Sequence, residues 1–239
     1  MKYAFISDIH GNANALDAVL DDINKQRVDK IIVLGDIAYR GPEPKRSIEL
    51  IKSLNTTVVK GNADEWVVRG VRQGEVPDQA LELMNLEREW IVNRIDQVDI
   101  DFLAGLPTEA IIEVDGVTMQ AFHATPTSLF DVVLPDATED KLETKLFCEK
   151  DAHLYLYGHI HKAYTRVVNG KTVVNLGSVG LPFDGVTKAS YAIVEVSGGT
   201  ISTSHRRVAY DYNKTIRQYE DSHYPNTQMM KKIIETGSI

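Results

Sequence analysis

The sequence predicts an α/β fold, and three observations carry that prediction. Two short apolar runs, residues 2–6 and 30–34, end abruptly at polar residues, as strands buried on both faces of a sheet do. The residues between these runs follow helical spacing. After residue 107 the turn dipeptides of β-hairpins replace the helical pattern.

The first half of the chain begins with two strand–helix–strand units. The first helix carries its apolar residues on one face, at Leu16, Val19, Leu20 and Ile23. The second helix does the same at Ile48, Ile51 and Leu54, and residues 56–59 supply the strand that follows it. Residues 65–105 then lack strand signals and repeat apolar residues at helical spacing, as at Leu83, Leu86, Trp90 and Ile91. We expect these residues to form a helical insert.

The second half is predicted to be an antiparallel or mixed sheet. Its hairpin turns are indicated by Asp115-Gly116, Asn169-Gly170 and Gly198-Gly199, each between β-rich runs. The tail, residues 211–239, predicts two helices broken at Pro225, the second with Met229, Met230, Ile233 and Ile234 on one face. Because no linker or repeat interrupts the chain, residues 1–239 are expected to form a single domain.

Composition excludes several classes of protein. Lysine and arginine total 26 against 34 acidic residues, which disfavours general nucleic-acid binding and a nuclease groove. No apolar run approaches the length of a membrane span, and Asp8 and His10 interrupt the apolar start before a secretion signal forms, so we expect a cytoplasmic protein. The single cysteine, Cys148, excludes an internal disulfide and a cysteine zinc cluster, and we expect its side chain to be buried.

Metal-binding residue types recur in loops directly after predicted strands, where α/β proteins build their sites. They occur in the blocks Asp8-Ile9-His10, Gly35-Asp36, Gly61-Asn62, His123 and Gly158-His159-Ile160-His161. These blocks offer seven nitrogen and oxygen ligands, which are too many for one tetrahedral zinc ion and enough for two ions if one carboxylate bridges them. The neighbouring glycines are expected to let the backbone approach the ions.

These blocks, in this order, resemble the calcineurin-like metallophosphoesterase superfamily over roughly residues 3–210. The residues around them, including Gly11-Asn12, Gly41-Pro42 and the stretch 177–180, are similar to a small bacterial and archaeal phosphodiesterase branch. The resemblance implies a four-layer α/β/β/α sandwich with mixed sheets. It also implies a phosphoesterase in which a hydroxide bridging two divalent ions attacks phosphorus, with Mn²⁺, Fe or Zn²⁺ all suited to such ligands.

The resemblance assigns roles to individual residues. Asp8, His10 and His161 would hold one ion, Asn62, His123 and His159 would hold the other, and Asp36 would bridge them. Asp36, Asn62 and His123 would thus be catalytic, together with Arg40, which stands where related phosphatases bind phosphate. An ion pair is the alternative for Arg40. Trp66 is placed to stack on a nucleobase, and burying the insert against the core is its alternative role.

One residue departs from the family pattern. The family often has histidine, a general acid, after the asparagine, whereas this chain has Ala63 followed by Asp64, which we expect to support the ligands. Losing a general acid costs about 10²–10⁴-fold for a poor leaving group and much less for an acidic one. We therefore expect a small phosphodiester or nucleoside-polyphosphate substrate, of the dinucleoside polyphosphate type.

The alternative function is a catalytically weak, metal-bound scaffold that binds proteins, as a retromer subunit with a similar fold does. The departure at position 63 and the helical insert suit a scaffold, but a scaffold needs no complete ligand set. The apolar face of the last helix either packs within the chain or forms an oligomer contact.

Overall fold

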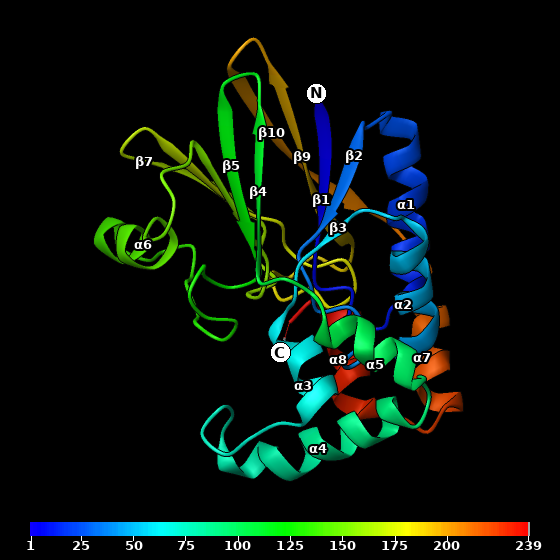
Figure 1. Cartoon of the computed structure of the whole chain (residues 1–239). Helices are drawn as coiled ribbons and strands as arrows, with labels where there is room; N and C mark the ends of the chain where they lie inside the picture. Colours follow the sequence, from blue (N-terminus) through cyan, green and yellow to red (C-terminus); the bar gives the residue numbers. More distant parts are fainter. Residues whose placement is uncertain (239) are drawn as a thin grey trace.

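The computed structural model describes residues 1–238, and its first sheet contains the predicted N-terminal strands (Figure 1). In this sheet β1 (Lys2–Ile6), β2 (Lys30–Val33) and β3 (Thr57–Val58) run parallel. The antiparallel strands β9 (Ala189–Ser197) and β10 (Thr200–Val208) complete the order β10-β9-β1-β2-β3. The sheet is therefore mixed.

The second sheet contains the strands β4 (Glu109–Val114), β5 (Val117–Phe122), β6 (Leu154–Tyr157), β7 (Tyr164–Val168) and β8 (Lys171–Asn175), in the order β4-β5-β6-β8-β7. It is also mixed, because β6 runs parallel to β5 and β8 while the hairpin partners are antiparallel. All three predicted hairpin turns are confirmed. Their turn residues have positive φ, for example 48° at Asp115 and 78° at Gly116, as two-residue hairpin loops require.

Four layers result, which confirms the expected α/β/β/α architecture. An apolar layer that includes Phe5, Leu34, Met119 and Leu156 is buried between the two sheets. Helices α1 (Ala13–Gln26) and α2 (Pro44–Ser53) lie on the outer side of the first sheet, and α7 (Tyr212–Asp221) and α8 (Thr227–Thr236) extend this layer past the ends of the strands, next to the insert. Helix α6 (Glu139–Leu146), which the sequence pattern did not reveal, covers the second sheet.

The insert consists of α3 (Asn62–Arg69), α4 (Asp78–Val92) and α5 (Gln97–Ala104). It begins at Asn62, three residues before the expected start. The expected apolar stripe of α4 was half wrong, because Leu83 and Leu86 are exposed while Trp90 and Ile91 are buried. The remaining buried positions of α4 are Met84 and Glu87, so the face that packs against the core includes a carboxylate that no apolar pattern can indicate.

The exposure of Cys148 and of one residue of α8 differs from expectation. Cys148 is exposed, contrary to expectation, because it follows α6 at the surface of the second sheet's helical layer. In α8 the predicted apolar face is buried at Met230, Ile233 and Ile234, while Met229 is exposed. That face packs within the chain. Among residues 1–238 no helix has the length and apolar character needed to cross a bilayer.

Candidate metal centre

The predicted ligand residues meet where strands of both sheets end. Asp8 and His10 follow β1, Asp36 follows β2, and Asn62 begins α3 after β3. From the second sheet, His123 follows β5, and His159 and His161 follow β6. Because β1, β2, β5 and β6 end on the same side of the sandwich, seven residues spread over 154 positions of the chain lie together.

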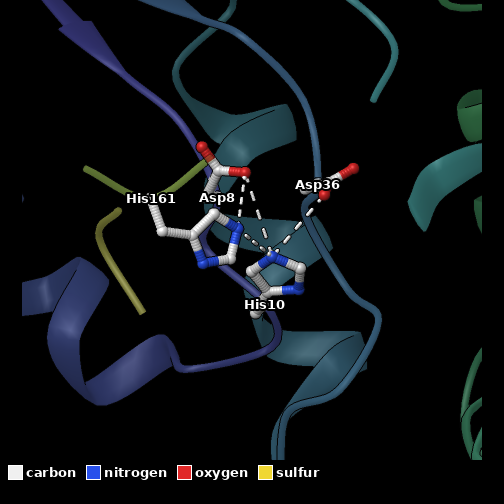
Figure 2. Close-up of side chains that lie close together, drawn as sticks. All are labelled: Asp8, His10, Asp36 and His161. Carbon is white, nitrogen blue, oxygen red and sulfur yellow. Dashed lines mark hydrogen bonds and ion pairs between the residues drawn. The ribbon is translucent and has the colours of Figure 1, made fainter. Parts of the chain in front are cut away.

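The first group contains Asp8, His10, Asp36 and His161, whose ligand atoms all lie within 4.8 Å of one another (Figure 2). The Nε2 atom of His161 is 3.1 Å from Asp8 Oδ1. The Nε2 atom of His10 is 3.9 Å from the same oxygen and 3.5 Å from Asp36 Oδ2. Ligand atoms that share a divalent ion at about 2.1 Å are separated by roughly 3.0–3.4 Å, so these spacings suit a metal site.

The orientation of the two imidazoles in this group suits a metal ion between them. Nδ1 of His10 donates to the Tyr39 carbonyl oxygen (2.8 Å), and Nδ1 of His161 donates to that of Leu181. A neutral ring that is protonated at Nδ1 has a bare lone pair at Nε2, yet the two Nε2 atoms are 3.1 Å apart. No hydrogen bond can join two bare nitrogens, whereas a metal ion would use both, and a carbonyl at Nδ1 is the usual support of a ligating histidine.

The second group contains Asp36, Asn62, His123 and His159. Asn62 Oδ1 is 2.8 Å from both His123 Nε2 and His159 Nδ1. His123 again donates from Nδ1 to a carbonyl oxygen, that of Leu34 (2.7 Å). His123 Nε2 is 3.4 Å from Asp36 Oδ2, the same oxygen that faces His10 in the first group. Asp36 therefore stands between the two groups.

The loops hold these side chains with an unusual backbone. Five of the seven residues are in the left-handed region, with φ between 48° and 65°: Asp8, His10, Asp36, His159 and His161. Few residues other than glycine adopt this conformation, although aspartate and histidine do so more readily than most. Such residues cluster at functional sites, where the surrounding structure maintains them.

Two glycines of the motifs allow the loops that carry the predicted ligands to pack closely against one another. A Cβ atom at Gly61 would lie 2.0 Å from Asp36 Oδ1, and one at Gly158 would lie 2.5 Å from Asp8 Oδ2. Both distances are far inside van der Waals contact. The absent side chains thus leave room for the two ligand carboxylates, a role that differs from the expected approach of the backbone to the ions.

Burial and neighbouring charges shift the pKa values of the ligand residues. Burial, together with His161, lowers the pKa of His10 to about 4, and burial with His123 lowers that of His159 to about 4. Burial opposes the ionisation of Asp36, but the facing His123 and His10 still hold its pKa below the ordinary value. His10 and His159 are therefore neutral and Asp36 is ionised at neutral pH, which are the forms that bind metal. Burial opposes the protonation of His123, but the facing Asp36 still raises its pKa to about 9, so this histidine would release a proton when it binds metal.

Asp64 connects the loops that carry Asp36 and Asn62, as the sequence led us to expect. Its carboxylate accepts hydrogen bonds from the backbone N–H groups of Asp36 (2.9 Å), Ile37 (2.8 Å) and Gly61 (2.8 Å). Ala63 is buried, and its backbone N–H donates to Asp36 Oδ1 (2.8 Å). Asp36 is thus held by both residues that follow Asn62.

Arg40 forms the ion pair that was its alternative role, although with a buried partner. Its Nε donates to Glu87 Oε2 of α4 at 3.2 Å, and the Glu87 side chain has no exposed surface. Within residues 1–238 neither Nη atom of Arg40 has a hydrogen-bond partner, and the side chain is 21% exposed. The ion pair therefore leaves one edge of the guanidinium available. Sequence reasoning missed Glu87, because a glutamate in a charged helix resembles a solvated residue.

Trp66 performs the packing that was its alternative role. Its ring contacts Tyr39 and Phe130, with ring centroids 5.8 and 5.9 Å apart, and its Nε1 donates to Glu75 Oε2 (3.1 Å). It is half-buried and still borders the ligand cluster. Phe183, which no motif indicated, stacks on the His161 ring with centroids 4.3 Å apart.

A small hollow of about 130 Å³ opens over the ligand cluster, bordered by Arg40, Trp66 and Phe183 as well as by the ligands. A larger hollow of about 560 Å³ lies elsewhere, among the loops that lead into β2 and β3, and is lined by residues such as Arg27 and Asn55. Those loops are at the opposite ends of the parallel strands from the ligand cluster, and none of the seven predicted ligand residues lines this larger hollow. We therefore place the candidate site at the smaller hollow.

Comparisons with known proteins agree with this geometry. The pattern described as the calcineurin-like phosphoesterase superfamily domain matches residues 1–199. An uncharacterized protein of Methanocaldococcus jannaschii is 32% identical to this chain over 239 residues, and the match covers 93% of each.

Two solved structures cover nearly the whole chain. A metallophosphoesterase from Sphaerobacter thermophilus is 27% identical, with a TM-score of 0.79 and 99% of both chains covered. A hypothetical protein from Pyrococcus horikoshii OT3 shares the fold at 23% identity, with a TM-score of 0.86 over 99% of this chain and 98% of its own.

Proposed function

Because the chain belongs to the calcineurin-like phosphoesterase superfamily, we propose that it is a phosphoesterase with two metal ions that hydrolyses phosphodiester or nucleoside-polyphosphate bonds. The observation that carries this proposal is the position of Asp36. One of its oxygens, Oδ2, faces His10 at 3.5 Å and His123 at 3.4 Å, and these histidines belong to different ligand groups. A carboxylate between two such groups suits a bridging ligand.

The residues present fit two divalent ions. Asp8, His10 and His161 would hold one ion, Asn62, His123 and His159 the other, and Asp36 both. Mixed imidazole and oxygen ligands without a thiolate suit Mn²⁺, Fe or Zn²⁺. Two bound ions would supply a hydroxide at neutral pH and stabilise negative charge on phosphoryl oxygens.

Arg40 is proposed to bind the phosphoryl group beside the ions. Its Nε is occupied by Glu87, so the two Nη atoms form the edge that remains for an anion. Two parallel N–H donors match two oxygens of a phosphate. The small volume of the central hollow, about 130 Å³, suits a phosphoryl group and is well below the volume of pockets that hold whole organic ligands.

The substrate class follows from Ala63. At this position the family often has a histidine that protonates the leaving group, and a buried methyl group cannot replace it. Leaving groups that are already acidic need no such proton, which favours phosphoanhydrides and aryl diesters over alkyl monoesters. Trp66 borders the hollow and is proposed to contact the base of a nucleotide substrate at the edge that its packing partners leave uncovered.

A hydrolysis panel with added Mn²⁺ tests this proposal. It compares an aryl monoester, an aryl diester, a cyclic nucleotide and a dinucleoside polyphosphate, with a chelator as control. We expect chelator-sensitive cleavage of the diester or the polyphosphate, and much slower cleavage of the monoester. Two bound ions without turnover of any substrate would instead favour the protein-binding scaffold.

A further inference from the structure

A second hollow of about 460 Å³ lies beside the candidate metal centre. It shares the lining residues His159 and Phe183 with the central hollow, so the two hollows adjoin. Its other walls are mostly apolar, and they include Val132 and Leu134 from the loop between β5 and α6. This volume falls within the range of pockets that bind organic ligands.

The loop presents these two apolar side chains to solvent on a fixed backbone. Val132 is 51% exposed and Leu134 is 40% exposed. Between them, the Val133 side chain is buried, and its carbonyl oxygen accepts a hydrogen bond from the Tyr157 hydroxyl at 2.7 Å. Arg166 Nη1 donates to the carbonyl oxygens of Pro135 (3.1 Å) and Ala137 (2.6 Å). The exposure therefore results from an anchored loop that holds the side chains beside the centre.

The character of the walls indicates an aromatic ligand. Phe183 and His159 supply two rings, and aromatic ligands gain from offset or edge contacts with rings beyond the area that they bury. Lys162 lies at the exposed side of the same hollow, where an ammonium group can face the π-system of a bound ring. An aliphatic chain would use the apolar walls without either contribution.

We propose that this hollow, formed by Val132, Leu134, Ile160 and Phe183 beside His159, binds the aromatic group attached to the phosphate of the substrate. The inference rests on the proposed function and deepens it, because it divides the site into one part for the phosphoryl group and another for the aromatic group. The phosphoryl group occupies the central hollow near Arg40, and the aromatic group extends past His159 toward Leu134. A substrate of this shape is an aryl phosphoester, or a dinucleoside polyphosphate with one base at Trp66 and the other in this hollow, rather than inorganic polyphosphate.

Binding of two phosphonates that are not hydrolysed tests the proposal independently of turnover. Phenylphosphonate and methylphosphonate are titrated by calorimetry into the metal-loaded protein, whose metal content is measured first. We expect phenylphosphonate to bind about tenfold more tightly, since burying most of a phenyl ring contributes on that order. In Leu134→Ser we expect the tenfold preference for phenylphosphonate to fall to about threefold or less. The affinity for methylphosphonate should stay unchanged.

Val98→Ser is the matched control, because Val98 is 67% exposed on α5, away from the hollow, and should keep the full preference. Equal affinities of the wild-type protein for the two phosphonates, including no measurable binding of either, would overturn the proposal. So would a preference that Leu134→Ser and Val132→Ser both retain. A phenyl preference without any hydrolysis in the substrate panel would leave the aromatic site intact and refute the proposed function.

Discussion

At the scale of single residues, the candidate centre depends on how each side chain is held. Each of three ligand histidines donates its Nδ1 proton to a backbone carbonyl, so that its Nε2 faces the cluster. Asp36 accepts a hydrogen bond from the Ala63 N–H at one oxygen and faces two histidines with the other. These contacts orient the ligands before any ion binds, which reduces the cost of assembling the site.

Removing either central ligand should abolish turnover. In Asp36→Asn the bridging charge is lost, and in His123→Ala one group loses an imidazole. We expect activity at background for both, with fewer than two ions per chain by elemental analysis and near-native circular dichroism. His223→Ala, at an exposed histidine far along the chain, should keep full activity. Full activity in both ligand variants would refute the two-ion assignment.

Asp64→Asn should destabilise the protein and weaken metal binding. The carboxylate accepts three backbone N–H groups, and an amide must turn its own N–H₂ toward at least one of them. An unsatisfied buried donor costs about 1–3 kcal/mol. We expect a loss of this size in urea unfolding, together with weaker metal binding, because Asp36 and Asn62 are no longer aligned. An unchanged unfolding midpoint would show that the three hydrogen bonds are dispensable.

At the scale of elements, the insert and the C-terminal helices meet behind the candidate site. Glu87 of α4 accepts hydrogen bonds from Arg40 Nε, from the Tyr224 hydroxyl (3.3 Å) and from Asn226 Nδ2 (3.1 Å). The Tyr219 hydroxyl of α7 donates to the Arg40 carbonyl oxygen at 2.6 Å. Arg40 is thus held by elements more than 40 residues and more than 170 residues away in the chain.

Glu87→Gln should affect substrate binding more than the chemical step. The substitution removes the buried charge that fixes the guanidinium, and Arg40 is then free to change its orientation. We expect KM to rise several-fold with a smaller change in kcat, measured on an aryl diester. Glu89→Gln makes the same chemical change at an exposed position of α4 and should leave both constants unchanged. A fall in kcat with KM unchanged would contradict the positioning role.

A different ion pair joins α1 to the first sheet and should make stability depend on pH. Asp22 accepts two hydrogen bonds from Arg206 of β10 (3.0 and 2.9 Å) and one from the Tyr191 hydroxyl of β9 (2.7 Å). The hydrogen bonds from Arg206, with that from Tyr191, hold the pKa of Asp22 below its ordinary value. A carboxyl with a lowered pKa contributes stability above the unfolded pKa and loses it as the pH falls through the folded pKa.

Asp22→Asn should therefore reduce stability at neutral pH and flatten its loss in acid. We expect a difference of about 1 kcal/mol from wild type at pH 7, which shrinks as the pH falls through the lowered pKa of Asp22. Urea unfolding across this pH range measures it. Asp21→Asn, at the exposed neighbouring position, should match wild type throughout. A constant difference at every pH would contradict an ionic origin.

At the scale of the whole molecule, the site exists only because two sheets end together. The first sheet contributes Asp8, His10, Asp36 and Asn62, and the second contributes His123, His159 and His161. A bound metal ion would therefore fasten one layer of the sandwich to the other. An ion that binds the folded chain alone stabilises the entire fold.

Removing the metal should lower the melting temperature. Saturation at 100 times Kd contributes about 2.7 kcal/mol for a single site, which corresponds to roughly 5–10 °C for a chain of this size. We expect a chelator to cause a decrease of this order in calorimetry, and Mn²⁺ or Zn²⁺ to reverse it. Asp36→Asn should respond much less. A melting temperature that is indifferent to the chelator would argue against metal held between the sheets.

Local patterns predicted much of the fold because they depend on neighbours in the chain. Short apolar runs located β1 and β2, helical spacing located α1 and α2, and turn dipeptides located all three hairpins. The short α6 was not located, and the stripe of α4 was half wrong, since exposed Leu83 and buried Glu87 reverse the usual pattern.

The sequence by itself determined which residues meet, since five short motifs after strand ends named all seven side chains of the cluster before their geometry was known. Only the tertiary structure decided what surrounds them. Glu87 beneath Arg40, Phe183 on His161 and the hollow beside Leu134 depend on contacts between segments far apart in the chain. No local spacing encodes such contacts, because they are selected by how the layers pack.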